Sequence, residues 1–289
     1  MSATNIHKDA AGNIKADVKR AGQKAEYSPV IEALTRLGYG VRGVIYFTMG
    51  LLALNVAFGK SSGPIDQQSA IAAIGRQPAG MVLLWLILIG LVSYSLWGVI
   101  RAIMDPLHKG HDTKGLLTRA GFLISAIAYA SFILPTYGFI KGSGSTSQSG
   151  AQTQGFMASI MSKPGGHWVI GVVGLAVLAV GLYQIYQGFK NSFDKQFQTY
   201  AMTAEEVKVA KQLGRFGTAT RGLIFAIVGG LIMLAAYQSN SSQPVGIDAA
   251  LTTLLHQPYG IWLLGIVAIG LLAFGIYSML SAAWFRLKR

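Results

Sequence analysis

The sequence predicts an all-α polytopic membrane protein. Its six transmembrane helices are expected to form three parallel two-helix repeats, each with a short interfacial helix on the outer side. Three observations lead to this fold class. The chain of 289 residues is 52% hydrophobic and only 12% charged, whereas soluble domains usually carry about 25% charged residues. Six apolar segments are long enough to cross a bilayer, and one motif recurs three times.

Six segments reach the roughly 20 apolar residues that a transmembrane helix needs. We expect these spans at residues 38–58, 80–103, 117–139, 167–190, 217–237 and 260–284. Residues 1–33 are polar, so we interpret them as a cytoplasmic N-terminal segment and not as a cleaved signal peptide. Ser28-Pro29 is typical of a helix start, with a capping serine followed by a first-turn proline.

The positive charge is concentrated on one side of the predicted spans. Most of the 24 Lys and Arg residues lie before residue 38, in the loops 101–119 and 190–215, or at the C-terminus. This distribution matches the excess of basic residues in cytoplasmic loops, so we expect both termini in the cytoplasm. The net charge of +13 then indicates anionic lipid at the cytoplasmic face as the partner, and no nucleic acid.

The first helix of each repeat carries the recurring motif. RLGYGVRGVIY, RAGFLISAIAY and RFGTATRGLIF align position by position. The shared arginine is Arg36, Arg119 and Arg215, and the shared glycine is Gly38, Gly121 and Gly217. Six residues after the first arginine stand Arg42 in the first copy and Arg221 in the third, whereas the second copy has Ser125.

The second helix of each repeat also aligns. The prolines Pro78, Pro164 and Pro258 stand just before a span, where a first-turn proline is tolerated. A short amphipathic segment precedes each proline, and Asp66 and Asp248 are expected to cap two of these segments. About ten residues cannot cross a bilayer, so we expect interfacial helices on the outer side.

These alignments divide the chain into three repeats, at residues 34–110, 111–195 and 203–289. Each copy starts in the cytoplasm, so the repeats are parallel and related by an axis along the membrane normal. We expect a six-helix bundle with pseudo-threefold symmetry.

The aligned motifs resemble the bacterial domain-of-unknown-function family 1206. Its unit is similar to an R-x-G-x-x-x-R-G-x-x-Y start, a Q-P-x-G turn and a G-L-x-x-Y-x-x-W end. The second copy departs from this pattern at Ser125 and at Lys163-Pro164. The resemblance covers roughly residues 34 to 285 and implies a multi-pass protein of the bacterial inner (plasma) membrane. It implies no established activity, cofactor or substrate.

Arg42 and Arg221 are the candidate site residues, as lipid or anion contacts. Each lies six residues beyond the first arginine of its repeat, which is about 9 Å deeper at ~1.5 Å per residue. One interpretation is that they anchor lipid phosphate or brace neighbouring helices. The other is that they face the axis between the repeats and form a partial positive ring that favours anions.

Catalytic, cofactor and metal sites are not predicted. The six spans contain no Asp or Glu, which argues against proton-coupled or sodium-coupled transport. His108 and His111 are a loose pair in a loop, too few for a metal site. Phosphate loops, zinc-protease helices and nucleophile elbows are also absent from the sequence.

We therefore expect a non-enzymatic scaffold or accessory subunit, with a larger membrane protein complex as partner. The alternative is a channel or facilitator for a small solute or anion along the pseudo-threefold axis.

Overall fold

A computed structural model describes residues 29–105, 110, 112–142, 149–190 and 203–284, and all regular elements in these ranges are helices. The first repeat holds α2 (Pro29–Ala57), α3 (Gln67–Gly75) and α4 (Gly80–Met104). The second holds α5 (Thr113–Ala130), α6 (Ile133–Ile140), α7 (Ser149–Met161) and α8 (Gly166–Phe189). The third holds α9 (Ala204–Tyr237), α10 (Ile247–Leu255) and α11 (Gly260–Trp284). The all-α class with six long apolar spans is confirmed.

The third span is broken, whereas the sequence predicts one helix over 117–139. α5 ends at Ala130 and α6 begins at Ile133. Pro135 explains the break, because it has no N–H to donate to the carbonyl of Ser131 and its ring would clash with that carbonyl in a continuous helix. The two pieces together still form an apolar stretch of membrane length, Gly115–Ile140.

Two helices begin earlier than the predicted spans. α2 begins at Pro29, which confirms the helix start predicted from Ser28-Pro29, and α9 begins at Ala204 instead of at 217. The start of α9 is fixed by a capping box, in which Thr203 and Glu206 each accept a hydrogen bond from the other's backbone N–H. Hydropathy marks only the part of a helix that lies in lipid, so it misses these polar extensions. The predicted N-terminal segment falls largely outside the described residues.

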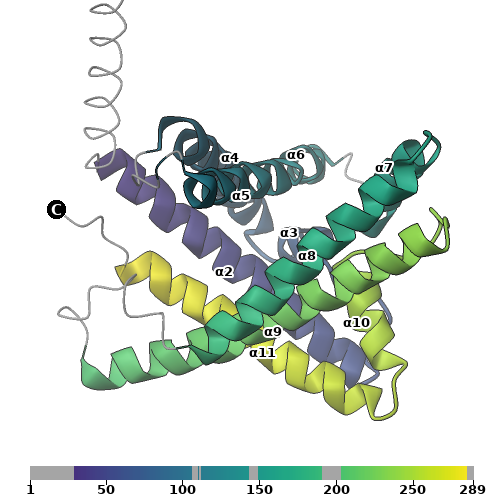
Figure 1. The fold of residues 1–289 in the computed structure, drawn as a ribbon. Coiled ribbons are helices and arrows are strands. Elements are labelled where there is room, and N and C mark those ends of the chain that lie inside the picture. Colours follow the sequence, from purple (N-terminus) through teal and green to yellow (C-terminus); the bar gives the residue numbers. More distant parts are fainter. Residues whose placement is uncertain (1–28, 106–109, 111, 143–148, 191–202, 285–289) are drawn as a thin grey trace, which may run out of the picture.

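The three repeats run in the same direction. α2, α5 and α9 begin on one side of the molecule, and α4, α8 and α11 end on that side (Figure 1). The short helices α7 and α10 lie toward the opposite end, and α3 lies nearer the centre of this view (Figure 1). Each copy has the predicted order of a span, a short helix and a second span.

The repeats contact one another in a cyclic order. The second helix of each repeat packs along the first helix of the next, which pairs α4 with α5, α8 with α9, and α11 with α2. The last pair joins the end of the chain to its beginning, so the packing closes into a ring.

Glycines bring the paired backbones together. A Cβ added to Gly275 of α11 would lie 2.7 Å from the backbone N of Phe47 and 2.9 Å from the carbonyl O of Gly43 on α2. Between α8 and α9, a Cβ on Gly222 would lie 2.7 Å from the carbonyl O of Gly181. Small residues at such points allow the van der Waals contact that drives helix association in lipid.

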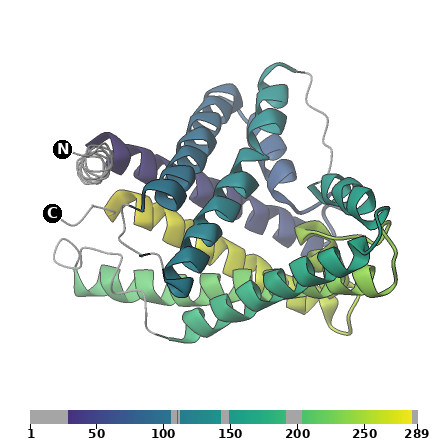
Figure 2. The same cartoon turned by 45° about the horizontal axis from the view of Figure 1, so that its top comes forward.

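The second repeat is more exposed than the other two. In the third and fourth spans only 11% and 17% of the most apolar stretch is buried, against 44% to 56% in the other four spans. α2 packs against α4 and α9 against α11, but among the described helices α5 and α8 do not pack along their length. The two run in different directions (Figure 2). The core therefore lies between the first and third repeats.

We predict that Gly275→Val destabilises the protein, because the added atoms collide with the α2 backbone. Overpacking of this kind typically costs about 1–3 kcal/mol. Gly265→Val on the same helix is the matched control, since an added Cβ there meets no atom within 4 Å. Thermal unfolding in detergent should show a lower midpoint for the first variant only. Equal midpoints would contradict the glycine-mediated contact.

Candidate functional site

Arg42 and Arg221 approach the same aromatic ring. The Cζ atoms of both guanidinium groups lie 5.2 Å from the ring centroid of Phe274, which is on α11. Arg42 also lies over Tyr39 at 4.8 Å, and Arg221 over Phe225 at 5.0 Å. The two arginines are only partly buried as residues, but the Nε atom of each is buried and has no hydrogen-bond partner.

A third arginine joins the pair. Arg101, near the end of α4, places its Cζ 4.5 Å from the ring centroid of Phe122 and 5.8 Å from that of Tyr94. Its Nε is likewise buried without a hydrogen-bond partner. Tyr94 hydrogen-bonds with Arg101 and packs against Gly38, one helical turn before Arg42. We name Arg42, Arg101 and Arg221 the arginine cluster.

Arg101 was not predicted as a site residue, because it stands where the predicted span meets the basic loop 101–119. A usable signal is present: Arg101 follows Tyr94 by seven residues, which is two helical turns and therefore the same face of α4. Tyr94 and Phe274 hold equivalent places in the aligned segments GLVSYSLW and GLLAFGIY.

Arg101 compensates for the arginine missing from the second repeat. Ser125 stands at that position, and its side chain hydrogen-bonds with Tyr94. Tyr94 also hydrogen-bonds with the side chain of Arg101. The neighbouring helix thus supplies a guanidinium group beside the position where the repeat itself has a serine.

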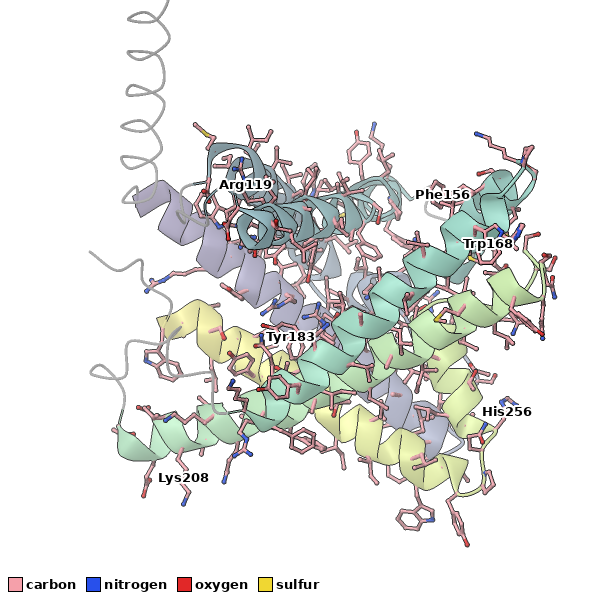
Figure 3. The ribbon with its side chains drawn as sticks, viewed as in Figure 1. Arg119, Phe156, Trp168, Tyr183, Lys208 and His256 are labelled. Atoms are coloured by element: carbon pink, nitrogen blue, oxygen red, sulfur yellow. The ribbon has the colours of Figure 1, made fainter. Side chains whose placement is uncertain are left out.

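The first arginine of each repeat has a separate role at the helix ends. The Nε of Arg119 donates to the carbonyl of Ala102 at 2.8 Å, and one Nη donates to the carbonyl of Ile103 at 2.9 Å. Both carbonyls belong to the last turn of α4, where the backbone acceptors have no partner within the helix. Figure 3 shows Arg119 on α5 beside that end of α4.

Arg215 repeats this contact one unit later. Its Nε donates to the carbonyl of Gly188 at 3.2 Å, near the end of α8. Each of these cations therefore binds the C-terminal end of the preceding repeat, where the helix dipole favours positive charge. Arg36 lies partly buried at the corresponding place in the first repeat.

The signature glycines lie against the second helix of their own repeat in two of three copies. A Cβ on Gly38 would meet the Tyr94 side chain at 3.0 Å, and one on Gly217 would meet Cα of Phe274 at 2.6 Å. The corresponding Gly121 is exposed, and an added Cβ would have no atom within 4 Å. The difference follows from the separation of α5 and α8.

The signature prolines lie just before the spans, as predicted, but they are not in the first helical turn of the spans. Pro78, Pro164 and Pro258 each lie two residues before the span, in a turn that follows the short helix. In the first turn the N–H of Gly80 donates to the carbonyl of Gln77 at 2.8 Å, and Ala79 has φ +62°. Proline followed by a residue of positive φ is the signature of a type II turn. The prolines therefore fold each short helix back onto its span.

Asp248 links the third repeat to the first near the short helices. Asp66 caps α3 as predicted, by accepting from the N–H of Ser69, but the N-cap of α10 is Gly246 and not Asp248. The Asp248 carboxylate instead accepts from the N–H of Ile65 at 2.8 Å and so joins the third repeat to the first. The pKa of Asp248 is raised above its ordinary value, chiefly because the carboxyl group is partly buried. The nearby Asp66 adds to this rise, and the hydrogen bond from Ile65 opposes it.

A pocket of about 540 Å³ opens beside Asp248. Its lining includes Gln154, Gln243 and His256. Among the described residues, no group of three His, Asp or Glu side chains is placed to hold a metal ion. His108 and His111 lie outside the described residues. We assign Asp248 to packing between repeats, because its carboxylate is occupied by the Ile65 contact.

The family described as Domain of Unknown Function (DUF1206) matches the chain three times, over residues 37–105, 120–191 and 216–285. The chain belongs to this family. It is similar to the uncharacterized protein YxxB of Bacillus subtilis (strain 168), with 31% identity over 261 residues. That alignment covers 90% of this chain and 94% of the relative. No solved structure matches the chain.

We predict that Arg119→Ala destabilises the contact between α4 and α5, because two carbonyl groups lose a charged donor. A hydrogen bond to a charged group contributes roughly 1.5–3 kcal/mol, and partial solvent exposure reduces that value. Thermal unfolding in detergent should show a lowered midpoint for Arg119→Ala and a smaller change for Arg119→Lys, which keeps one donor. A wild-type midpoint for Arg119→Ala would refute the capping role.

Proposed function

We propose that this member of the DUF1206 family is a non-enzymatic scaffold or accessory subunit of a membrane protein complex. We place it in a bacterial inner membrane with both termini in the cytoplasm. The observation that carries the proposal is the low burial of the third and fourth spans within the chain, 11% and 17%. These two helices belong to one repeat and yet do not pack along each other.

The exposed faces of the second repeat are apolar over the length of a bilayer. On α5, Ile124 is 68% and Ile127 is 62% exposed, and on α8, Val172 is 66% and Leu175 is 55% exposed. A surface that is apolar and of membrane length fits a transmembrane helix of another protein. Association there would rest on van der Waals packing, as between other helices in lipid.

The interior of the ring supports the same proposal. Met49 and Leu271 are fully buried, and Ile224 is 1% exposed. Tyr46 packs edge-on against Phe274, with 4.8 Å between the ring centroids. Packed side chains of this kind fill the space between the first and third repeats, where a solute path along the axis would need to run.

The alternative is a channel or facilitator for a small solute or anion. The arginine cluster favours this alternative, because arginine side chains attract anions in pores. The filled interior disfavours it. We therefore treat the cluster as a place where an anion binds and not as part of a path that crosses the membrane.

We predict that the second repeat contacts a partner helix in native membranes. A photo-crosslinking residue at Ile127 or Val172 should yield a covalent adduct with another protein. Ile266 and Ile269 of α11 are the matched controls, because they are similarly exposed at 55% and 54% and lie outside the second repeat.

Three results are distinguishable in this experiment. Adducts confined to the second repeat support the proposal. Adducts between two differently tagged copies of this chain would replace the foreign partner with a second copy. Equal yields from α11 and from the second repeat, or no adduct from either, would mean that the second repeat has no specific partner, and the accessory-subunit proposal would fail.

A further inference from the structure

The arginine cluster forms one connected row of cations and rings. Arg42 and Arg221 both lie 5.2 Å from the ring of Phe274. Arg101 lies 5.8 Å from the ring of Tyr94, and Tyr94 packs against Gly38, one helical turn before Arg42. The row crosses from the first repeat to the third. All three arginines lie in the half of the bundle where the first helices begin, which we place toward the cytoplasm.

The spans themselves supply no acidic side chain to this row, and the carboxylate that follows it on α4 is that of Asp105, four residues after Arg101 at the helix end. The six predicted spans contain no Asp or Glu. A guanidinium group cannot release its proton at any pH that a protein tolerates, so burial cannot neutralise it. Three fixed positive charges in a medium of low dielectric constant repel one another and favour the arrival of an anion.

The aromatic rings satisfy the arginines only in part. A ring face attracts the guanidinium cation, but it leaves the Nε–H donors of Arg42, Arg101 and Arg221 buried without a hydrogen-bond partner. Buried donors of charged groups are normally paired. Phosphate oxygens are suited to accept from several guanidinium groups at once, because the planar fork of arginine matches their geometry.

We propose that Arg42, Arg101 and Arg221 bind a phosphate group within the cytoplasmic half of the bundle. The phosphate can belong to the headgroup of an anionic lipid or to a soluble phosphate. This site is separate from the partner surface of the second repeat, and neither proposal depends on the other.

The second repeat offers a route by which a phosphate group can reach the arginine cluster. Ser125 and Val180 hold the positions at which the other repeats have Arg42 or Arg221 and Tyr94 or Phe274. Both are smaller than their equivalents, and α5 and α8 do not pack along each other. Phe122 and Tyr129 of α5 cover Arg101 and Tyr94, so the side of the cluster without a helix contact is the one where α8 would pack against α5. Approach from this side suits a lipid whose acyl chains remain in the bilayer.

The test measures binding to the full chain in neutral detergent. The probes are short-chain phosphatidylglycerol, short-chain phosphatidylcholine and inorganic phosphate. The binding of each probe is measured by calorimetry. We expect phosphatidylglycerol to bind more tightly than phosphatidylcholine. Arg42→Gln and Arg101→Gln should each weaken that binding by about tenfold, the weight of one charge-assisted hydrogen bond. Lys208→Gln is the matched control, because it removes the same charge from an exposed position on α9 (Figure 3).

The arms of the experiment separate the two sources of phosphate. Binding of phosphatidylglycerol without binding of inorganic phosphate assigns the site to a lipid headgroup, and binding of both at similar strength assigns it to a soluble phosphate. If Arg42→Gln alters the gel-filtration profile, Arg101→Gln and Arg101→Lys decide, with the lysine variant expected to bind at intermediate strength. The proposal is overturned if no probe binds, if phosphatidylcholine binds equally well, or if the arginine variants bind like Lys208→Gln.

Discussion

Close backbone contact between the second helix of one repeat and the first helix of the next is the constraint on which this structure depends. In lipid, apolar side chains gain nothing by leaving one apolar surface for another, so helices associate through close van der Waals packing. The pair Gly43 and Gly275 provides such a contact between the third repeat and the first, and Gly181 and Gly222 provide it between the second and the third. Because the contact also joins the last repeat to the first, three hairpins close into a ring.

The signature arginines follow from this arrangement in two ways. Arg119 and Arg215 begin a repeat and bind the free carbonyl groups at the end of the preceding one, so they connect neighbouring hairpins at the end of the bundle where the first helices begin. Arg42 and Arg221 lie deeper and share the ring of Phe274. The Nε donors of Arg119 and Arg215 are bonded to backbone carbonyl groups. The Nε donors of Arg42 and Arg221 are buried without a partner, so this second pair is the better candidate for binding a ligand.

The fold could be predicted from the sequence because each repeat contains two apolar segments of membrane length, and these segments are the helices of the structure. Six apolar lengths and an asymmetric distribution of Lys and Arg gave the spans and their order. The break at Pro135 and the polar start of α9 were missed, since apolar content does not register a missing backbone donor or a helix outside lipid. Arg101 was missed as a cluster member because its role depends on Tyr94 and Ser125 from two packed helices. The separation of α5 and α8 is also a tertiary feature. The repeat pattern alone would predict that the two long helices of each copy pack together.

The most direct test of the ring is a disulfide between the first and third repeats. The chain has no cysteine, and a Cβ on Gly40 would lie 3.8 Å from the Cβ of Ala282, which is the separation that disulfides require. The ring predicts that Gly40→Cys with Ala282→Cys forms an intramolecular bond on oxidation in native membranes, as should Gly171→Cys with Ala236→Cys between the second and third repeats. The mismatched pair Gly40→Cys with Ala236→Cys should remain reduced. Failure of the first pair to link, or linkage only between separate chains, would contradict the closed ring.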